Sequence, residues 1–278
     1  MKLPELPDPI YQSILNESKS RSEPVGRYHV TEVIYCLQKV QLIRAALATR
    51  RADSAIKQVS WVLFRGQVFH KAFQPLMGNG IPVEYTWTTK QGDKVTLIGE
   101  ADWIESDEKG PLVGELKTAK NISWYIKNGP GPEHIKQAAA YMWMLNNMGQ
   151  DINRTAFYYM DMSDIERIPV VFDREKLDLN MSWLKDRVER LHVALKNNEI
   201  ADLRIPWKES WECNPAYCPF TEFCHPDYPF DPPSEHPDLE TWWAGPMKVA
   251  RHNIEDNIIP TEAVKAILEE AGLVCSWR

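Results

Sequence analysis

Long apolar runs are missing from this sequence of 278 residues. The longest run, from Ala138 to Leu145, is far shorter than the roughly 18 residues that a membrane-spanning helix needs. The first ten residues, MKLPELPDPI, mix charge with proline and lack the apolar segment of a secretory signal. We therefore expect a cytoplasmic protein that has no membrane partner.

Two further motifs or residue types are absent or scarce. No G-x-x-x-x-G-K-[ST] motif occurs, so we expect no helicase motor within this sequence. The cysteines number only five, and in a reducing compartment they are not expected to form a disulfide framework. Metal binding is therefore a better explanation of the cysteines than disulfide bonding.

The formal net charge of −7 argues at first against a nucleic-acid partner, but the charge is unevenly distributed. Residues 220–278 hold 11 acidic and 4 basic side chains. Residues 33–74 instead carry seven basic residues and one acidic residue, a balance that suits contacts with phosphate groups. A solvated helix face is an equally good explanation of this stretch. The residues predicted to bind nucleic acid are Arg44, Arg50, Arg51, Arg65 and Lys71.

Hydrophobic periodicity predicts a mixture of helices and strands. One helix is expected over TEVIYCLQKVQLIRAAL, with Thr31 as its N-cap, and another over SWVLFRGQVFHKAFQPLM, which Pro75 and Gly78 help to terminate. Further helices are expected over 133–149, 175–198 and 261–271, and strands near 82–89, 94–105, 111–118, 154–162 and 166–172. This order predicts an α/β or α+β domain with a mixed central β-sheet, and we favour an α/β fold in which helices flank the sheet.

An acidic and a basic residue occupy the strand expected at 111–118. Successive side chains alternate between the faces of a strand, so Glu115 and Lys117 share a face and Leu116 points to the other. Asp102, on the neighbouring strand, is expected beside them. Carboxylate oxygens grouped in this way suit Mg²⁺ or Mn²⁺. A salt-bridged hairpin is the alternative, although the apolar residues around both motifs favour buried strands.

These residues carry a resemblance to a known family. GEAD at 99–102 and GELK at 114–117 resemble the signature of the PD-(D/E)xK nuclease superfamily, in particular its RecB-like branch. RGQVFH at 65–70 is similar to the histidine motif of that branch, and QAAAY at 137–141 is similar to its Q-x-x-x-Y motif. The resemblance implies a restriction-endonuclease-like core within a nuclease domain over 27–230, between an irregular arm at 1–26 and an acidic extension at 231–278.

The resemblance also implies a role for each motif residue. His70, Asp102, Glu115 and the backbone carbonyl of Leu116 would bind one or two divalent ions. Lys117 would orient the attacking water or neutralise the phosphate, and Gln137 and Tyr141 would position the substrate or Lys117. Glu100 is a second acid two residues before Asp102, and Asp102 is preferred because it occupies the aspartate position of the family.

Three cysteines lie in the proline-containing stretch CNPAYCPFTEFCHP. With Cys36, the residues Cys213, Cys218 and Cys224 supply four thiols, enough for zinc or for an iron-sulfur cluster. One early and three late cysteines resemble the iron-sulfur nucleases of the AddB and CRISPR-associated Cas-four type, which implies a cluster that staples the two ends of the domain. A 4Fe-4S cluster is favoured. The spacing between Cys213 and Cys218 is longer than is usual in these nucleases, so 2Fe-2S and zinc stay open as alternatives. His225 and Cys275 are possible substitute ligands.

The function expected from the resemblance is metal-dependent DNA exonuclease activity on single-stranded ends, in CRISPR adaptation, recombination or repair. Proteins of CRISPR adaptation or recombination would then be possible partners. Two alternatives stay open. One is a restriction-type or structure-specific endonuclease of a mobile element. The other is a non-catalytic DNA-binding subunit of an assembly.

Overall fold

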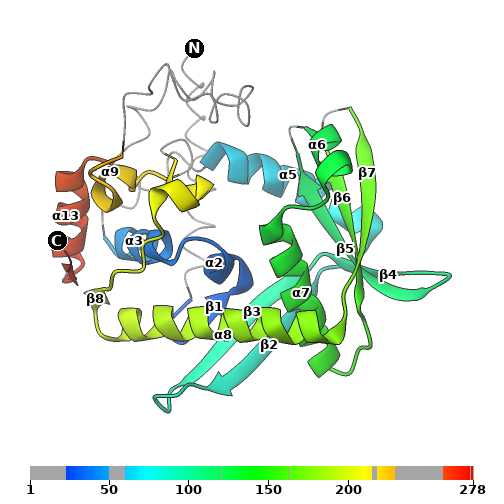
Figure 1. The fold of residues 1–278 in the computed structure, drawn as a ribbon, viewed down its shortest axis with the longest axis horizontal. Coiled ribbons are helices and arrows are strands. Elements are labelled where there is room, and N and C mark those ends of the chain that lie inside the picture. Colours follow the sequence, from blue (N-terminus) through cyan, green and yellow to red (C-terminus); the bar gives the residue numbers. More distant parts are fainter. Residues whose placement is uncertain are drawn as a thin grey trace. The chain divides into compact units, whose positions relative to one another are not determined.

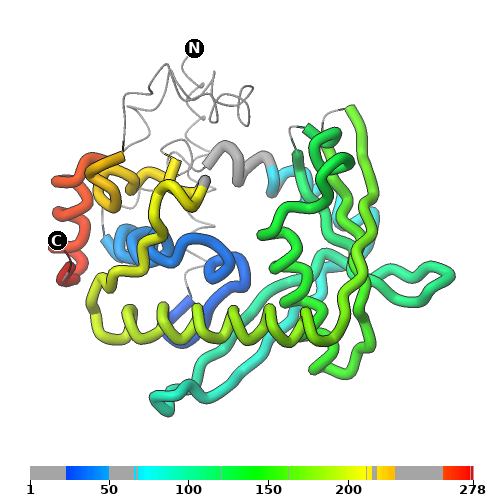
Figure 2. Tube along the Cα trace, in the orientation of Figure 1, coloured from blue at the N-terminus to red at the C-terminus, as the bar shows by residue number. Residues whose placement is uncertain are grey.

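A computed structural model describes residues 23–49, 60–119, 121–161, 163–214, 218–228, 259–275 and 277; the side chains at 60–65, 67 and 211 are not described. These residues form two compact units (Figures 1 and 2). The sheet unit comprises Glu23–Tyr35 and Val62–Lys196. The described residues of the cysteine unit fall within Cys36–Trp61 and Asn197–Arg278. No helix in the described ranges is long and apolar enough to cross a membrane.

A three-stranded sheet forms the first part of the sheet unit. Its strands are β1 (Arg27–His29), β2 (Ile81–Thr88) and β3 (Lys94–Ala101), in the order β1-β3-β2. β2 and β3 form an antiparallel hairpin, and β1 pairs with β3 in parallel. Val83, Val95 and Leu97 are buried, so one face of this hairpin is apolar, as alternation in its sequence predicts.

A second sheet follows directly. It contains β4 (Trp103–Asp107), β5 (Gly110–Thr118), β6 (Arg154–Met160) and β7 (Ile165–Val171) in chain order, with β5 and β6 parallel and the other pairs antiparallel. The described strands therefore form two hydrogen-bonded sheets, where the sequence predicted one central mixed sheet. The strand expected at 94–105 is interrupted by a bend at Asp102, which separates β3 from β4.

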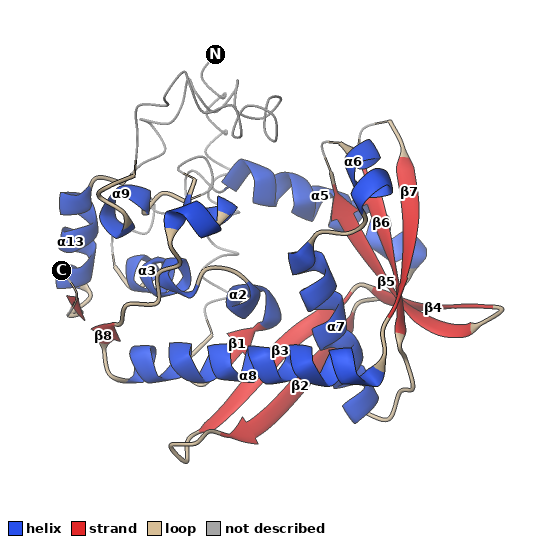
Figure 3. Cartoon of the chain, viewed as in Figure 1, coloured by secondary structure: helices blue, strands red, loops and turns tan. Residues whose placement is uncertain are grey.

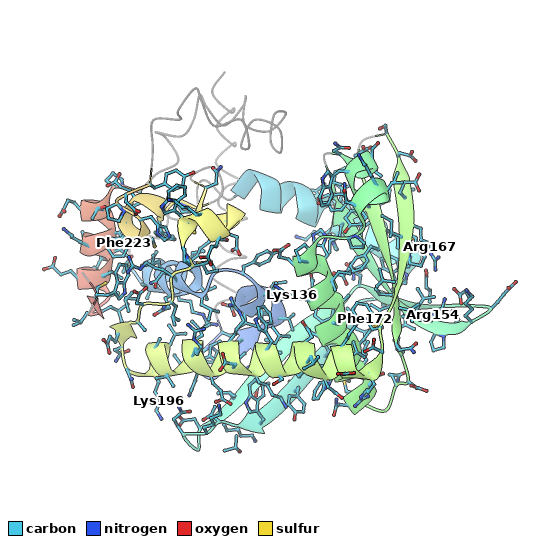
Figure 4. All side chains as sticks on the ribbon, viewed as in Figure 1. Lys136, Arg154, Arg167, Phe172, Lys196 and Phe223 are labelled. Atoms are coloured by element: carbon cyan, nitrogen blue, oxygen red, sulfur yellow. The ribbon has the colours of Figure 1, made fainter. Side chains whose placement is uncertain are left out.

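Charged side chains fix the exposed end of the β4–β5 hairpin to its neighbours. The Arg154 guanidinium on β6 donates a hydrogen bond to each oxygen of Asp107, and Arg167 on β7 pairs with Glu105 at 3.2 Å. Figure 4 labels both arginines, which lie beside these strands. The arginines hold the pKa of Asp107 down at about 2, mainly through the hydrogen bonds from Arg154. These contacts support the antiparallel edges of the sheet.

The described residues of the sheet unit also form five helices, and Figure 3 shows them beside the strands. They are α2 (Val30–Ile34), α5 (Ser60–Met77), α6 (Ile122–Asn128), α7 (Pro132–Asn147) and α8 (Arg174–Lys196), of which α5 begins two residues before the unit. α7 buries every side chain from Ala138 to Leu145 and packs against α8, α2 and β2. This central position explains why the longest apolar run of the sequence is a helix rather than a strand.

One local prediction was wrong. The single helix expected from Thr31 is two helices, with His29 as the N-cap of α2 and an interruption at Tyr35 and Cys36. Arg187 of α8 donates to the carbonyls of Val33 and Tyr35, which satisfies the end of α2 and favours the interruption. α5 instead has the predicted bounds: it contains Pro75 in its last turn and ends immediately before Gly78, and a proline so near the end removes few helical hydrogen bonds. The sequence analysis did not predict α6.

The cysteine unit is mainly helical. It contains α3 (Leu37–Leu47), α9 (Thr221–Cys224), α13 (Thr261–Glu270), the short 3-10 turns η1 (Trp207–Glu209) and η2 (Trp211–Cys213), and a two-stranded sheet of β8 (Glu199–Ile200) and β9 (Val274–Cys275). Its apolar core joins α3, α9 and α13 through Leu42, Phe220, Phe223, Val264 and Ile267. Segments at the two ends of the sequence therefore share one core.

Candidate active site

The acid and the amine of β5 lie on the same face of the strand, as their spacing predicts. Glu115 is 1% exposed, and its Oε1 accepts a hydrogen bond of 2.5 Å from Nζ of Lys117. Leu116 is buried on the opposite face with Trp103 and Met160. The two ionisable groups are therefore fixed by a strand whose other face is anchored in apolar packing.

The bend at Asp102 brings a second carboxylate to this strand. Oδ2 of Asp102 accepts a 2.7 Å hydrogen bond from the backbone amide of Leu116, and Oδ1 lies 3.5 Å from Nδ1 of His70 on α5. Gln74, one helical turn after His70, donates from Nε2 to the carbonyl oxygen of Asp102. The bend is thus held from two directions, by β5 and by α5.

The position of Asp102 in the bend also distinguishes it from Glu100. In a continuous strand both acids would share a face, but here Asp102 is buried and Glu100 is exposed. The Glu100 side chain passes over Gly80, where a Cβ atom would approach Oε1 to 2.1 Å. This geometry favours Asp102 over Glu100 as the residue beside His70.

Electrostatics at the site follow from burial and from the nearby charges. Burial raises the pKa of Asp102, and burial together with the charge of Asp102 raises the pKa of Glu115 to about 7. Burial by itself favours the neutral amine of Lys117, yet the charges of Glu115 and Asp102 outweigh it and raise its pKa. The pKa of His70 is lowered by burial and by Lys117. Two carboxyls, one ammonium and a neutral imidazole make a site that favours added positive charge.

Helix α7 supplies the polar groups above the lysine. Nζ of Lys117 donates to Oε1 of Gln137 at 2.9 Å, and Nε2 of Gln137 lies 3.0 Å from the Tyr141 hydroxyl. Burial raises the pKa of Tyr141, so its hydroxyl keeps its proton. A chain of hydrogen bonds therefore runs from Glu115 through Lys117 and Gln137 to Tyr141.

Gln74 and Gly99 are site residues that the sequence analysis missed. A Cβ atom at Gly99 would lie 2.5 Å from Cε1 of Tyr141, so the absence of a side chain on β3 makes room for the tyrosine ring. Gln74 lies four residues after His70, and that helical spacing is the signal that could have identified it. Sequence spacing gave no comparable signal for the role of Gly99, because the side chain that it accommodates, Tyr141, lies on α7 rather than on β3.

The cysteines of the cysteine unit line one pocket. Cys36 lies just before α3, and Cys213, Cys218 and Cys224 reach the same pocket from η2, the following loop and α9. Burial, followed by the neighbouring thiols, raises the pKa of Cys213 to about 12, and burial raises the pKa values of the other three as well. The pocket is also lined by Gln38, Lys39, Arg204, Glu212, Thr221 and His225.

Hydrogen bonds hold the cysteine loop around this pocket. Oγ1 of Thr221 donates to the carbonyl oxygens of Cys213 and Cys218, each at 2.9 Å. The Cys36 amide donates to Oε2 of Glu212 at 2.8 Å. Nε2 of His225 lies 3.5 Å from Sγ of Cys213, whereas Cys275, on β9, does not line the pocket.

Both the carboxylate site and the cysteine pocket contain donor atoms that suit a metal. Oε2 of Glu115 is buried and has no hydrogen-bond partner, which is the condition that a cation would relieve. The four thiols have the chemistry of a soft-metal site. However, no group of three or more His, Cys, Asp or Glu side chains in the part of the chain that is described is arranged to hold a metal ion. The donors thus fit by chemistry and burial, while a preformed three-ligand arrangement is not observed.

The predicted nucleic-acid contacts are only partly described. Arg44 is half-buried on α3 in the cysteine unit, and Lys71 is exposed on α5 in the sheet unit. Arg50 and Arg51 lie outside the described residues, and the side chain of Arg65 is not described. Their role in binding nucleic acid stays a prediction.

Comparisons with known proteins bear on the fold and the family. The sequence profile of the PD-(D/E)XK nuclease superfamily matches residues 16–225. No curated protein matches the sequence. A crystal structure described as SSO0001 has a TM-score of 0.51 and 16% identity, covering 78% of this chain and 95% of that one. An alkaline exonuclease (LHK-Exo) from Laribacter hongkongensis has a TM-score of 0.39 and 14% identity, covering 69% and 95%.

Proposed function

The chain belongs to the PD-(D/E)XK nuclease superfamily, and on this basis we propose that it is a metal-dependent DNA exonuclease of the RecB-like branch, acting on single-stranded ends. The observation that carries the proposal is the buried arrangement of Asp102, Glu115 and Lys117, with one unpartnered oxygen on Glu115. Most buried polar atoms of native proteins have a hydrogen-bond partner, so an unpartnered carboxylate oxygen beside a second buried acid supports a cation site.

Each residue of the site has a defined task in this proposal. Asp102, Glu115, His70 and the Leu116 carbonyl would hold Mg²⁺ or Mn²⁺ next to the scissile phosphate. The bound ion would supply positive charge to the phosphate and make a water molecule more acidic. The Leu116 amide holds one carboxylate oxygen of Asp102 and Gln74 holds its backbone carbonyl, so little reorganisation is needed when the substrate arrives.

Lys117 is placed to act on the charge that develops during hydrolysis. Its pKa is raised, so Nζ keeps its proton and can donate hydrogen bonds to a phosphate oxygen or to the attacking water. As water attacks phosphorus, the P–O3′ bond breaks and the 3′ oxygen takes up a proton. Gln137 holds Nζ of Lys117, and Tyr141 in turn holds Gln137, so both are positioning residues.

The nuclease assay should compare linear with circular single-stranded DNA in Mg²⁺ and in Mn²⁺. We expect the wild type to degrade the linear strand and to leave the circle intact, while Glu115→Ala degrades neither. Cleavage of the circle would favour the alternative of an endonuclease of a mobile element. If wild type and Glu115→Ala leave all substrates equally intact, the chain is a non-catalytic DNA-binding subunit and the enzyme proposal is wrong.

We also propose that Cys36, Cys213, Cys218 and Cys224 hold an iron-sulfur cluster, with 4Fe-4S preferred over 2Fe-2S and over zinc. The support for this is that four buried thiols line one pocket, which is the number of thiolates that holds such a cluster. The visible absorption of anaerobically purified protein tests it. A brown chromophore that Cys218→Ser abolishes supports a cluster, and colourless protein with stoichiometric zinc contradicts it.

A cluster-bearing exonuclease of this kind would resemble the AddB and Cas-four types. Such an enzyme fits a role in CRISPR adaptation, recombination or repair, where single-stranded ends are trimmed. Genetic neighbourhood, or copurification with adaptation or recombination proteins, would distinguish among these settings.

A further inference from the structure

Three aromatic rings form a continuous column on the sheet unit. The Tyr159 ring on β6 stacks against the Tyr125 ring on α6, with centroids 3.9 Å apart and planes at 14°. Trp124 meets Tyr125 edge to face, with centroids 4.9 Å apart and planes at 83°. Tyr159 is fully buried and Trp124 is 39% exposed, so the column leads from the interior to the surface.

The inner end of this column adjoins the site residues. Tyr159 and Lys117 are register partners on the parallel strands β6 and β5, so their side chains project from the same face of the sheet. Tyr125 stacks on Tyr159 and so continues the column from this face. The amine of Lys117 and the inner ring of the column therefore lie on the same face of the sheet.

Hydrogen bonds hold the column rigid. Nδ1 of His134 lies 2.7 Å from the Tyr159 hydroxyl, and His134 is one helical turn before Gln137 on α7. The side chain of Asn121 caps α6 by accepting a 3.2 Å hydrogen bond from the amide of Trp124. Helix α6 contacts β6 and β7, so the column is held from below by the sheet. A rigid ring loses little conformational entropy when it binds a ligand.

We propose that Trp124 is a stacking platform for one nucleobase of a single-stranded substrate whose adjacent phosphate lies at Lys117. The inference rests on the proposed function, because that function puts a phosphodiester beside the column. Bases in a single strand expose their faces, and stacking on an aromatic side chain requires no particular sequence. A paired base keeps its faces covered within the duplex, so this platform selects single strands.

Binding is tested without cleavage, in EDTA, with a labelled oligothymidylate of about twelve nucleotides. We expect Trp124→Ala to weaken binding roughly ten-fold, the effect of losing one base stack, while Trp124→Phe retains most of the affinity. Ile126→Ala is the matched control, because Ile126 lies on the same helix and is 56% exposed. It should bind as the wild type does.

An abasic scan identifies the stacked base. A single abasic nucleotide is moved along the oligonucleotide, and affinities for the wild type and Trp124→Ala are compared. We expect one position at which removal of the base weakens binding to the wild type. At that position the affinity of Trp124→Ala should be the same with and without the base. Equal losses in both proteins at every position would overturn the proposal, as would unchanged affinity of a folded Trp124→Ala. Weakening by Ile126→Ala to the same extent would indicate a general apolar surface and also contradict it.

Cleavage measurements separate this inference from the proposed function. Methyl p-nitrophenyl phosphate is a phosphodiester without a base, so in Mn²⁺ Trp124→Ala should reduce the rate on single-stranded DNA by a larger factor than the rate on this compound. A wild type that hydrolyses neither this compound nor DNA would refute the proposed function, while the binding scan would still decide the platform. If Trp124→Ala reduces the rate on this compound as much as, or more than, the rate on DNA, the role in base stacking is contradicted.

Discussion

Nζ of Lys117 and Oε1 of Gln137 lie 2.9 Å apart, so a lysine of the sheet is held by helix α7. The same ammonium donates to Glu115, and the amide of Gln137 reaches Tyr141. Buried networks of this kind position each member through the others, and losing one member leaves the rest imperfectly satisfied. The first two predictions test this network.

Replacing Gln137 by alanine should reduce the rate of hydrolysis without abolishing it. Lys117 would keep its ion pair with Glu115 but lose its fixed direction, so kcat should fall about ten- to a hundred-fold. Lys117→Ala should cause a larger loss, because it removes the charge itself. Steady-state kinetics on linear DNA measure both effects. Asn147→Ala, an amide change at the other end of α7, serves as the control and should leave kcat unchanged.

A methyl group at Gly99 should displace the ring of Tyr141. Because a Cβ atom there would lie 2.5 Å from Cε1 of the tyrosine, Gly99→Ala should destabilise the fold by about 1–3 kcal/mol. In a Tyr141→Ala background the clash partner is gone, and the same substitution should cost much less. Urea unfolding of the four proteins measures this coupling. Equal costs in both backgrounds would show that Tyr141 is not the residue that Gly99 accommodates.

Local periodicity correctly predicted which of these side chains share a face. Glu115 and Lys117 share a face because the period of a strand is two residues, and Gln137 and Tyr141 meet because four residues make about one helical turn. The bend at Asp102 and the interruption before Cys36 could not be found in this way. They depend on the Leu116 amide and on Arg187, which are distant in sequence.

The aromatic column could not be predicted from the sequence for the same reason, because its contacts join residues that are distant in the sequence. Tyr125, His134 and Tyr159 lie on three different elements, and their contacts join residues up to 34 positions apart. Helix α6 is short and lacks a long apolar pattern, so periodicity gave no signal for it. Fold class could therefore be predicted from the order of elements, whereas the contacts that orient side chains required the tertiary structure.

His134 should make the sheet unit sensitive to acid. Burial, with a smaller effect of Lys117, lowers its pKa to about 3, while an unfolded histidine titrates near 6.5. The unfolded chain therefore binds the extra proton first, and stability present above pH 6.5 is lost as the pH falls toward 3. At pH 5 the expected loss is on the order of 2 kcal/mol at most.

His134→Gln removes this titration while keeping a side-chain partner for Tyr159. Urea unfolding of wild type and variant at pH 7.5 and pH 5 measures the difference. We expect the variant to lose less stability between the two pH values than the wild type. An identical loss in both proteins would show that His134 does not carry the acid sensitivity.

Divalent ions should stabilise the folded protein through Glu115 and Asp102. An ion that binds only the folded state, at a hundred times its Kd, adds about 2.7 kcal/mol, which raises the Tm by a few degrees. Glu115→Gln preserves the size of the side chain and an oxygen for Lys117, yet it removes the carboxylate whose Oε2 has no partner. The shift in Tm produced by Mn²⁺ should therefore nearly vanish in Glu115→Gln and in Asp102→Asn.

Asp107→Asn is the control for this prediction. It removes an exposed acid paired with Arg154, and its shift in Tm should equal that of the wild type. If all three variants respond to Mn²⁺ as the wild type does, the ion binds elsewhere and the unpaired oxygen of Glu115 has another cause.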